Sequence, residues 1–451
     1  NCGIDAKMIG KLASCVLSEK PAMIIPGYSI ARVAYGEEAF RLTVAIQLAT
    51  RNSGMLGGST GSINNCLPGV KVETLEELPS SLTKQGSVRG SLTREAQLWK
   101  DRDISLGAEA GLFNKRVPVL RWADAVLNPS SYGLRPIRVL YSAGGNFLNQ
   151  GANVTKNIRA FESVDFAVCH ELFLTPTANY CDVVLPVSDA FEKEDIGIPW
   201  AGNYVLYKPE ICRALPNTHS DYWIFSQLSE RIGVEPIFTE GRTESQWIDH
   251  FLAESEIDDI DAFKRHGIFI KKGQLRAGLD DFFANPVDHP IGTKSGKIEF
   301  ASPLWNSSMA SHWQGSIKEC FRQESCRRFW LLTPKVSRFI HSQRIEQEDR
   351  SECAQIHIHP EDMASLGAQK GEILKIWNSN GALLASAIPD VWLQPGIVWI
   401  EEGIWTMPID GVDLCGNPNM LTSDEGTLES ISNIMHGIPI QIERIAEANG
   451  Q

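Results

Sequence analysis

The chain has 451 residues, more than one compact hydrophobic core accommodates, so we expect two to four domains. A composition of 43% hydrophobic and 22% charged residues is typical of a globular protein and excludes a low-complexity chain. The net charge of −13 argues against a nucleic-acid-binding protein, and no apolar run approaches the roughly 18 residues that span a bilayer.

The opening segment predicts an α/β unit. Apolar residues at helical spacing indicate a helix over 6–17, and an apolar run predicts a short buried strand over 22–25. A turn at 27–29 and a long amphipathic helix over 36–50 follow, and then a glycine-rich loop. Strand, turn and helix in this order form the repeating unit of a doubly wound sheet.

A clearer alternation of strands and helices begins at residue 137. Strands are predicted over 137–141, 166–169 and 182–185, with one helix after the first strand that runs through about Phe161. A further helix is predicted over 221–232, with Ser220 as its N-cap. This alternation predicts a parallel sheet.

After residue 325 the sequence becomes rich in short β segments. The predicted strands are 329–332, 355–358, 372–377, 384–388, 397–400 and 438–445, and one helical turn is predicted at 360–366. We therefore expect four parts: an incomplete α/β domain at 1–134, a second α/β domain at 135–305, a linker at 306–324 and a closed β-barrel at 325–451. The fold class is α/β, with mostly parallel, doubly wound sheets followed by the barrel.

Polar side chains and glycines follow two of the predicted strands. Gly144, Gly145, Asn146 and Asn149 come after the strand at 137–141, where glycine lets a ligand approach the backbone; an ordinary tight turn would show the same residues. Glu171 follows the next strand and is placed to accept from a ribose hydroxyl or a guanine N–H, unless it is simply solvated.

Three further segments are candidates for ligand contacts. Asp221 lies in the first turn of a helix, where it either binds a ligand or stabilises the helix dipole. The stretch from Thr333 to Gln343 is a polar loop suited to phosphate, and the amides of Asn417 and Asn419 suit a heterocycle or an ordinary turn. No Walker loop, G-x-S-x-G elbow, H-E-x-x-H motif or C-x-x-C pair is present, so the residues alone predict a multidomain α/β protein that binds a nucleotide.

In their order along the chain, these segments resemble the molybdopterin oxidoreductases of the dimethyl sulfoxide and trimethylamine N-oxide reductase family. The matching segments are 144–150, 175–178, 182–186, 220–221, 295–299, 341–343 and 417–422. The chain departs from the family at Glu171, where Asp is usual, and at Tyr28 and Ala31, where Trp and Gln are common.

The resemblance implies a bis(molybdopterin guanine dinucleotide) cofactor that carries molybdenum or tungsten, and the last domain is then similar to the family's double-psi barrel. It implies an oxidoreductase that reduces an S-oxide or N-oxide by oxygen-atom transfer. The implied cofactor-binding residues are Tyr28, Arg32, Gly144, Gly145, Asn146, Asn149, Glu171, Thr175, Asp221, Thr333, His341, Ser342, Gln343, Asn417 and Asn419.

In the family, the metal ligand and any iron–sulfur motif lie upstream of the part that matches residue 1. We therefore assign no catalytic residue and no metal ligand, and expect this chain to be the incomplete C-terminal part of a catalytic subunit. Any iron–sulfur cluster would belong to the missing N-terminal part. Two alternatives stay open: another bis-pterin enzyme, acting on polysulfide, nitrate, an arsenic oxyanion or a phenol, and a non-catalytic cofactor-binding paralogue.

The resemblance also implies the partners and the cellular compartment of the protein. Its expected partners are a small-molecule substrate, an iron–sulfur electron-transfer subunit and a membrane anchor, with no nucleic acid. The expected role is anaerobic respiration in the periplasm, by analogy with the family.

Overall fold

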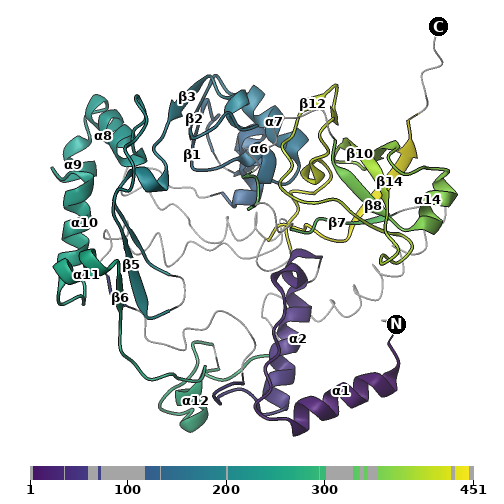
Figure 1. The fold of residues 1–451 in the computed structure, drawn as a ribbon, viewed down its shortest axis with the longest axis horizontal. Helices are drawn as coiled ribbons and strands as arrows, with labels where there is room; N and C mark the ends of the chain where they lie inside the picture. The colour runs from purple at the N-terminus through teal and green to yellow at the C-terminus, as the bar shows by residue number, and fades with distance from the viewer. Residues whose placement is uncertain are drawn as a thin grey trace. The chain divides into compact units, whose positions relative to one another are not determined.

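The structure is a computed structural model of the chain (Figure 1). It describes residues 4–34, 36–58, 70–72, 117–132, 134–199, 202–293, 295–300, 329–335, 340–343, 353–427 and 432–445. The predicted linker at 306–324 lies outside the described residues, and the loop from Thr333 to Gln343 is described only at its two ends.

The chain divides into two compact units, each built from separate stretches of sequence. Unit 1 comprises Asn1–Ile30, Glu37–Glu77 and Val187–Trp305, and unit 2 comprises Ala31–Gly36, Leu78–Pro186 and Asn306–Gln451. The units are therefore not consecutive along the chain, and the four domain boundaries expected from the sequence stay predictions.

Unit 2 contains a three-stranded parallel sheet. Strands β1 (Val139–Ala143), β2 (Phe166–Glu171) and β3 (Val183–Pro186) lie in this order and pair in parallel (Figure 1, blue). The short 3-10 helix η4 (Ala178–Tyr180) lies between β2 and β3 in the sequence. The predicted parallel sheet is confirmed, although β1 begins two residues later than expected and ends two residues later.

The helical connection from β1 to β2 differs from the prediction. Instead of one helix through Phe161 there are two, α6 (Phe147–Gln150) and α7 (Val154–Glu162). The chain breaks between them because Gly151 is extended at ψ 142° and Asn153 takes the left-handed conformation, with φ +54°. Asn153 then caps α7, since its side chain accepts from the backbone N–H of Lys156.

Within the described residues 117–132 of unit 2, three short helical elements lie before β1. They are η2 (Val119–Arg121), α5 (Trp122–Leu127) and η3 (Pro129–Tyr132). Ala123 and Val126 of α5 are buried against Ala160 of α7, so that α5 packs on the helix that follows the Asn153 cap.

The C-terminal part of unit 2 is a closed β-barrel. Its strands are β7 (Phe329–Leu332), β8 (Gln355–Ile358), β9 (Ile373–Trp377), β10 (Ala382–Pro389), β11 (Ile397–Trp399) and β14 (Ile438–Arg444), with the short β12 (Pro408–Ile409) and β13 (Val412–Asp413) at one edge. The order β10-β8-β11-β7-β14-β9 returns to β10 through a pairing of β9 with β10, which closes the ring. The predicted barrel is confirmed.

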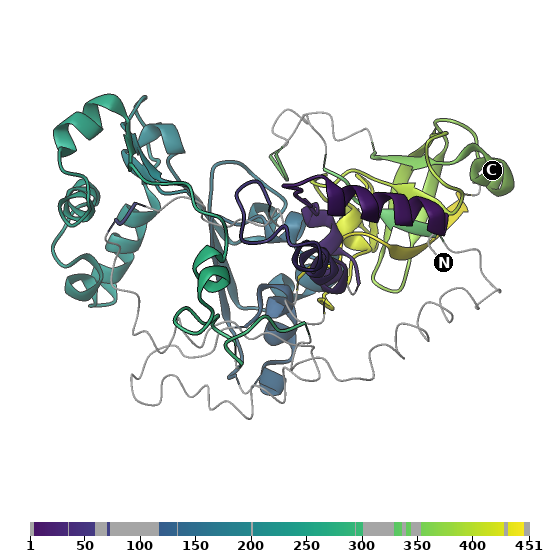
Figure 2. The same ribbon diagram turned by 90° about the horizontal axis from the view of Figure 1, so that it is seen from below.

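Alternating residues of the barrel strands fill its interior. Ile356 and Ile358 of β8, and Phe329 and Leu331 of β7, are completely buried, whereas their neighbours in sequence are more exposed. Helix α14 (Pro360–Leu366) and the 3-10 helix η6 (Pro418–Met420) complete this part, which is coloured green to yellow in both views (Figure 1; Figure 2).

Unit 1 combines helices with a small antiparallel sheet. Its helices are α1 (Ala6–Ser18), η1 (Tyr28–Arg32, shared with unit 2), α2 (Gly36–Ala49, which begins at the last residue of a unit 2 stretch), η5 (Ala190–Glu192), α8 (Asp221–Arg231), α9 (Glu235–Thr239), α10 (Glu244–Ala253), α11 (Ile260–His266) and α12 (Asp280–Ala284). The sheet order is β4 (Asp195–Gly197), β5 (Tyr204–Lys208) and β6 (Ile268–Ile270). None of these three strands was predicted from the sequence.

The strand predicted at 22–25 is wrong. This segment has no regular structure, because side chains rather than a neighbouring strand bind its backbone. Asn52 Oδ1 accepts from the Ala22 N–H at 2.9 Å, and Gln47 Nε2 donates to the Ala22 carbonyl at 3.1 Å. Pro21 and Pro26 flank the segment and offer no N–H to a ladder.

Across the described parts of both units, no helix is at once long enough and apolar enough to span a membrane.

Candidate functional site

A glycine turn leaves the carboxyl end of β1. Gly144 has φ +73°, a conformation that L side chains rarely adopt, and a Cβ added there would meet no atom within 4 Å. At Gly145, a Cβ would lie 2.6 Å from the ring of Phe147. The turn therefore needs both glycines and leaves its backbone open at Gly144.

The side chain of Asn146 holds this turn to the segment after β2. Asn146 Oδ1 accepts from Thr177 Oγ1 at 2.8 Å and from the Thr177 N–H at 3.3 Å. Thr177 Oγ1 also accepts from the Leu148 N–H at 3.0 Å. Thr177 is thus a buried anchor that sequence analysis quoted only as part of a motif, since its role depends on a contact with a residue 31 positions away.

Asn149 brings the first and the last predicted segments together. Its backbone carbonyl accepts from Asn419 Nδ2 at 2.8 Å and from Asn417 Nδ2 at 3.3 Å. Its own side chain is completely buried, yet neither Nδ2 nor Oδ1 has a hydrogen-bond partner among the described residues. A buried amide without partners costs about 1–3 kcal/mol, so it is suited to a polar ligand that offers both a donor and an acceptor.

A buried carboxylate shapes the loop that carries Asn417 and Asn419. Asp413 Oδ2 accepts from the N–H groups of Gly416 and Asn417 at 2.8 and 2.6 Å, and Oδ1 accepts from Thr406 Oγ1 at 3.0 Å and from the Met407 N–H at 2.5 Å. Burial raises the pKa of Asp413, although these hydrogen bonds oppose the rise. Sequence analysis missed Asp413, because only its burial distinguishes it from a surface turn residue.

Glu171 and Thr175 form a local pair at the same edge of the sheet as Gly144. Ala143 and His170 are register partners, so Gly144, which follows β1, and Glu171, the last residue of β2, lie at the carboxyl ends of neighbouring parallel strands. Glu171 Oε2 accepts from Thr175 Oγ1 at 3.2 Å, and Oε1 accepts from the Leu172 N–H at 2.9 Å. The carboxylate is half-buried and is held in one orientation by its own turn.

The two described ends of the polar loop rest on the barrel. Thr333 is buried, donates from its N–H to His436 Nδ1 at 3.1 Å and donates from Oγ1 to the Met435 carbonyl at 2.8 Å. Burial lowers the pKa of His436, with Glu402 opposing this effect and Arg32 adding to it. His436 therefore stays neutral, as its acceptor role requires.

The second end of this loop comprises His341, Ser342 and Gln343. The carbonyl of Ser342 accepts from Trp405 Nε1 at 2.7 Å, and the Gln343 N–H donates to the Ile340 carbonyl at 3.0 Å. His341 is exposed, and its Nδ1 lies 3.2 Å from Glu402 Oε1. A Cβ at Gly403 would lie only 1.9 Å from the His341 carbonyl oxygen, so glycine is required for this close approach.

Arg32 lies beside the barrel segment that contains Met435 and His436. Its carbonyl accepts from the N–H groups of Met435 and His436 at 2.8 and 3.1 Å, and its guanidinium donates to Ser432 Oγ at 2.9 Å. The barrel segment next to Thr333 therefore holds Arg32 by its backbone and by its side chain.

Tyr28 and Asp221 belong to unit 1. Tyr28 is 70% exposed. Asp221 begins α8, where Ser220 Oγ accepts from the Trp223 N–H at 3.1 Å, as predicted for an N-cap, and donates to Glu244 Oε2 at 2.7 Å. Ser220 and Trp223 line a cavity of about 410 Å³ in which the ring of His219 stacks on that of Trp223 at 3.7 Å.

In the stretches that the structure describes, no three His, Cys, Asp or Glu side chains gather into a group that could hold a metal ion.

Comparison with known families matches both halves of the chain. Residues 2–231, more than half of its length, match the molybdopterin oxidoreductase family, and residues 329–438, which contain most of the barrel, match the molydopterin dinucleotide binding domain. A solved structure, acetylene hydratase from Pelobacter acetylenicus, has a similar fold, with a TM-score of 0.68 at 18% identity over 98% of this chain and 63% of that one.

Several curated relatives are named as reductases of S-oxides or N-oxides. The chain is 28% identical to trimethylamine-N-oxide reductase of Haemophilus influenzae over 98% of its own length and 57% of that protein. It is 27% identical to dimethyl sulfoxide reductase DmsA of Escherichia coli over 98% and 56%, and 26% identical to biotin sulfoxide reductase of Cereibacter sphaeroides over 94% and 58%. The chain thus spans little more than half the length of these relatives. It belongs to the molybdopterin oxidoreductase family and carries a molybdopterin dinucleotide-binding domain.

Proposed function

We propose that this chain is part of the catalytic subunit of an oxidoreductase with a bis(molybdopterin guanine dinucleotide) cofactor that carries molybdenum or tungsten. The whole protein would reduce a small S-oxide or N-oxide by oxygen-atom transfer. Family membership and the activities named for the relatives support this function.

The buried amide of Asn149 is the main structural support for this function. A pterin or guanine ring has hydrogen-bond donors and acceptors along one edge, and this amide offers one group of each kind. Asn417 and Asn419 of the dinucleotide-binding domain hold the carbonyl of the same residue. The residues present therefore fit the group that the family implies.

The other residues of unit 2 have complementary roles in this proposal. The open backbone at Gly144 would admit a phosphate, Gly145 and Asn146 would keep the turn in place, and Glu171, held by Thr175, would accept from a ribose hydroxyl or a guanine N–H. Arg32, His341, Ser342 and Gln343, beside the buried Thr333, would contact the cofactor from the barrel side.

Two residues of unit 1 complete the proposed set. Asp221, in the first turn of α8, would accept from a guanosine, and Tyr28 would contact a dinucleotide through its exposed ring. When bound, the cofactor supplies the metal's two-electron oxygen-atom chemistry, and the protein supplies binding, orientation and exclusion of water.

Partners and location are further proposals that rest on the family resemblance alone. We propose that electrons come from an iron–sulfur subunit with a membrane anchor, and that the enzyme works in the periplasm. Co-purification of the whole protein with an iron–sulfur subunit from a membrane fraction tests the first proposal, and cell fractionation tests the second.

Turnover by the cofactor-loaded whole protein tests the proposed function. With a reduced viologen as electron donor, we expect dimethyl sulfoxide or trimethylamine N-oxide to reoxidise the dye, with dimethyl sulfide or trimethylamine as product. Turnover of nitrate, polysulfide or an arsenic oxyanion instead would contradict the substrate class. Bound cofactor with no turnover of any of these acceptors would favour a non-catalytic paralogue.

A further inference from the structure

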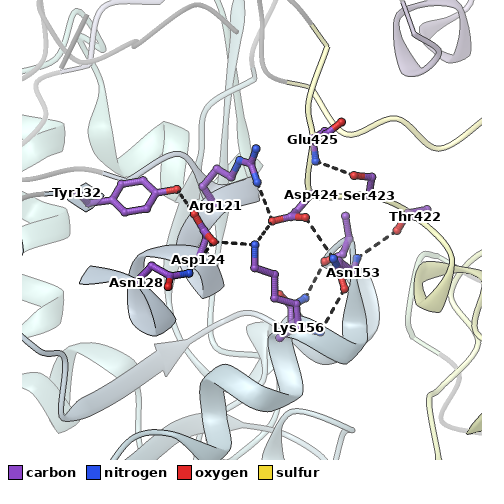
Figure 3. Close-up of polar contacts among 12 residues, drawn as sticks. Arg121, Asp124, Asn128, Tyr132, Asn153, Lys156, Thr422, Ser423, Asp424 and Glu425 are labelled. Carbon is purple, nitrogen blue, oxygen red and sulfur yellow. Dashed lines mark hydrogen bonds and ion pairs between the residues drawn. The ribbon is translucent and has the colours of Figure 1, made fainter. Parts of the chain in front are cut away.

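A group of buried charges joins the α/β part of unit 2 to its barrel (Figure 3). Asp424, in the barrel loop that follows η6, accepts through Oδ2 from Arg121 at 2.8 Å and from Lys156 Nζ at 2.7 Å. Arg121 comes from η2 and Lys156 from the first turn of α7. Asp424 is thus the barrel residue on which both cations converge.

These charges are balanced, and the pair of Arg121 and Asp424 is largely shielded from water. The side chains of Arg121 and Asp424 are only 9% and 11% exposed. Lys156 Nζ also lies 2.8 Å from Asp124 Oδ1, and Tyr132 and Asn128 donate to the carboxylate of Asp124. Two cations therefore face two carboxylates, and removal of one charge would leave an uncompensated charge in a poorly hydrated place.

The carboxyl of Asp424 is ionised in this setting. Burial alone would raise its pKa, but Lys156, Arg121 and Asn153 outweigh that effect and hold the pKa below its usual value. The pKa of Asp124 is also lowered, since Lys156, Tyr132 and Asn128 outweigh the effect of burial. Both carboxylates therefore carry a full charge at neutral pH.

A continuous series of hydrogen bonds leads from Asp424 to Asn149. Asp424 Oδ1 accepts from Asn153 Nδ2 at 3.2 Å, and the Asn153 N–H donates to the Thr422 carbonyl at 3.1 Å. Thr422 Oγ1 donates to Asn419 Oδ1 at 3.1 Å, and Asn419 Nδ2 donates to the Asn149 carbonyl at 2.8 Å. Asn153, at the break between α6 and α7, is one of the residues through which the two parts of unit 2 meet (Figure 3).

We propose that Asp424 is a positioning residue for the dinucleotide site. Its ion pairs with Arg121 and Lys156 hold the 422–424 loop against the start of α7, and this loop keeps Asn419 on the carbonyl of Asn149. Asp424 acts through Asn419 and Asn149 and not by its own contact with a ligand. The inference rests on the proposed function, because it takes Asn149 as a cofactor contact.

The substitution Asp424→Asn in the cofactor-loaded protein tests this role. Breaking a buried ion pair from one side is strongly unfavourable, so we expect guanosine monophosphate-containing cofactor to leave the variant at least about tenfold faster than the unaltered protein. The matched control is Asp165→Asn, which removes the same charge from a surface ion pair with Arg138. The side chains of Asp165 and Arg138 are 56% and 78% exposed. We expect the control to release cofactor at the unaltered rate.

A double variant separates positioning from general destabilisation. Arg121→Gln combined with Asp424→Asn leaves Lys156 and Asp124 as a balanced pair, so it should regain stability relative to Asp424→Asn. Its cofactor release should stay fast, because no ion pair holds the 422–424 loop. Hydrogen exchange gives a second readout: Asp424→Asn should speed exchange in 147–157 and 417–424 and leave β7 and β8 unchanged. If Asp424→Asn does not fold, Lys156→Gln, which leaves the Arg121 pair in place, should show the same pattern with a smaller increase in release.

Two results would overturn the inference while the proposed function stands. The first is unaltered cofactor release by a folded Asp424→Asn protein. The second is faster exchange spread evenly over the whole barrel, together with a double variant that returns to the unaltered rate of release. If the unaltered protein itself yields no guanosine monophosphate, the proposed function fails and this inference fails with it.

Discussion

At the scale of single residues, the main finding is that polar side chains far apart in sequence meet around Asn149. Asn417 and Asn419 lie 268 and 270 positions from the residue whose carbonyl they bind. The family resemblance predicts these residues as one site, but composition and spacing do not place them together. Asp413 and Asp424 were missed, and Thr177 was included only as part of a motif, because their roles depend on burial and on contacts that no local pattern encodes.

Replacement of Asn149 by Leu separates ligand binding from folding. The side chain has no partner among the described residues, so the cofactor-free protein should keep its stability or gain about 1 kcal/mol in the free energy of unfolding. The cofactor-loaded protein should retain much less guanosine monophosphate than the unaltered protein. Chemical unfolding of the cofactor-free form and nucleotide analysis of the loaded form measure the two effects.

The matched control for this variant is Asn157→Leu. Asn157 is also a buried asparagine, but its amide donates to the Ala152 carbonyl at 3.0 Å. Its replacement should lower the free energy of unfolding by about 1–3 kcal/mol, because the carbonyl loses its partner. Equal destabilisation of the cofactor-free protein by both substitutions would show that Asn149 is an ordinary core residue.

The stability of the barrel should depend on pH through His436. The folded protein lowers the pKa of this histidine below 6.5, mainly by burial, so the unfolded chain binds the proton more readily. Stability from this source is therefore complete above pH 6.5 and is lost as the pH falls through the lowered value. Urea unfolding between pH 7 and pH 5 should show this fall, and His436→Asn should flatten it; an unchanged slope in the variant would exclude His436 as the cause.

At the scale of secondary structure, the sequence predicts elements well where a long periodic pattern exists. The barrel strands β7 and β8 and the helices α1 and α8 lie within about two residues of their predicted bounds, an ordinary tolerance at element ends. Two predicted elements are wrong. Two prolines flank the strand predicted at 22–25, and Gly151 and Asn153 break the helix predicted to run through Phe161. The antiparallel sheet of unit 1 was not predicted.

The loop after β13 should depend on the carboxylate of Asp413. In Asp413→Asn, an amide NH₂ replaces one oxygen and faces N–H donors, so we expect the free energy of unfolding to fall by roughly 2–4 kcal/mol, as for other broken buried polar networks. Asp410→Asn, at an exposed position with φ +49° in the turn between β12 and β13, is the control and should change stability little. Similar effects of the two substitutions would contradict the role given to Asp413.

At the scale of the whole molecule, the sequence correctly predicts an α/β protein with a parallel sheet and a closed barrel. It does not predict that the compact units are built from separated stretches, since contacts between distant segments decide this. Unit 2 is the clearest case, because the barrel joins helical elements of the α/β part through Asp424 and through Asn149, and no local sequence pattern pairs these distant residues.

Cofactor analysis of the purified whole protein measures whether this chain helps to bind a bis(molybdopterin guanine dinucleotide). Metal content is measured by mass spectrometry, and guanosine monophosphate is released by acid and counted. We expect molybdenum or tungsten with about two guanosine monophosphates per metal atom, because one metal is held between two dinucleotides. Folded protein that contains neither metal nor nucleotide would contradict the proposed cofactor.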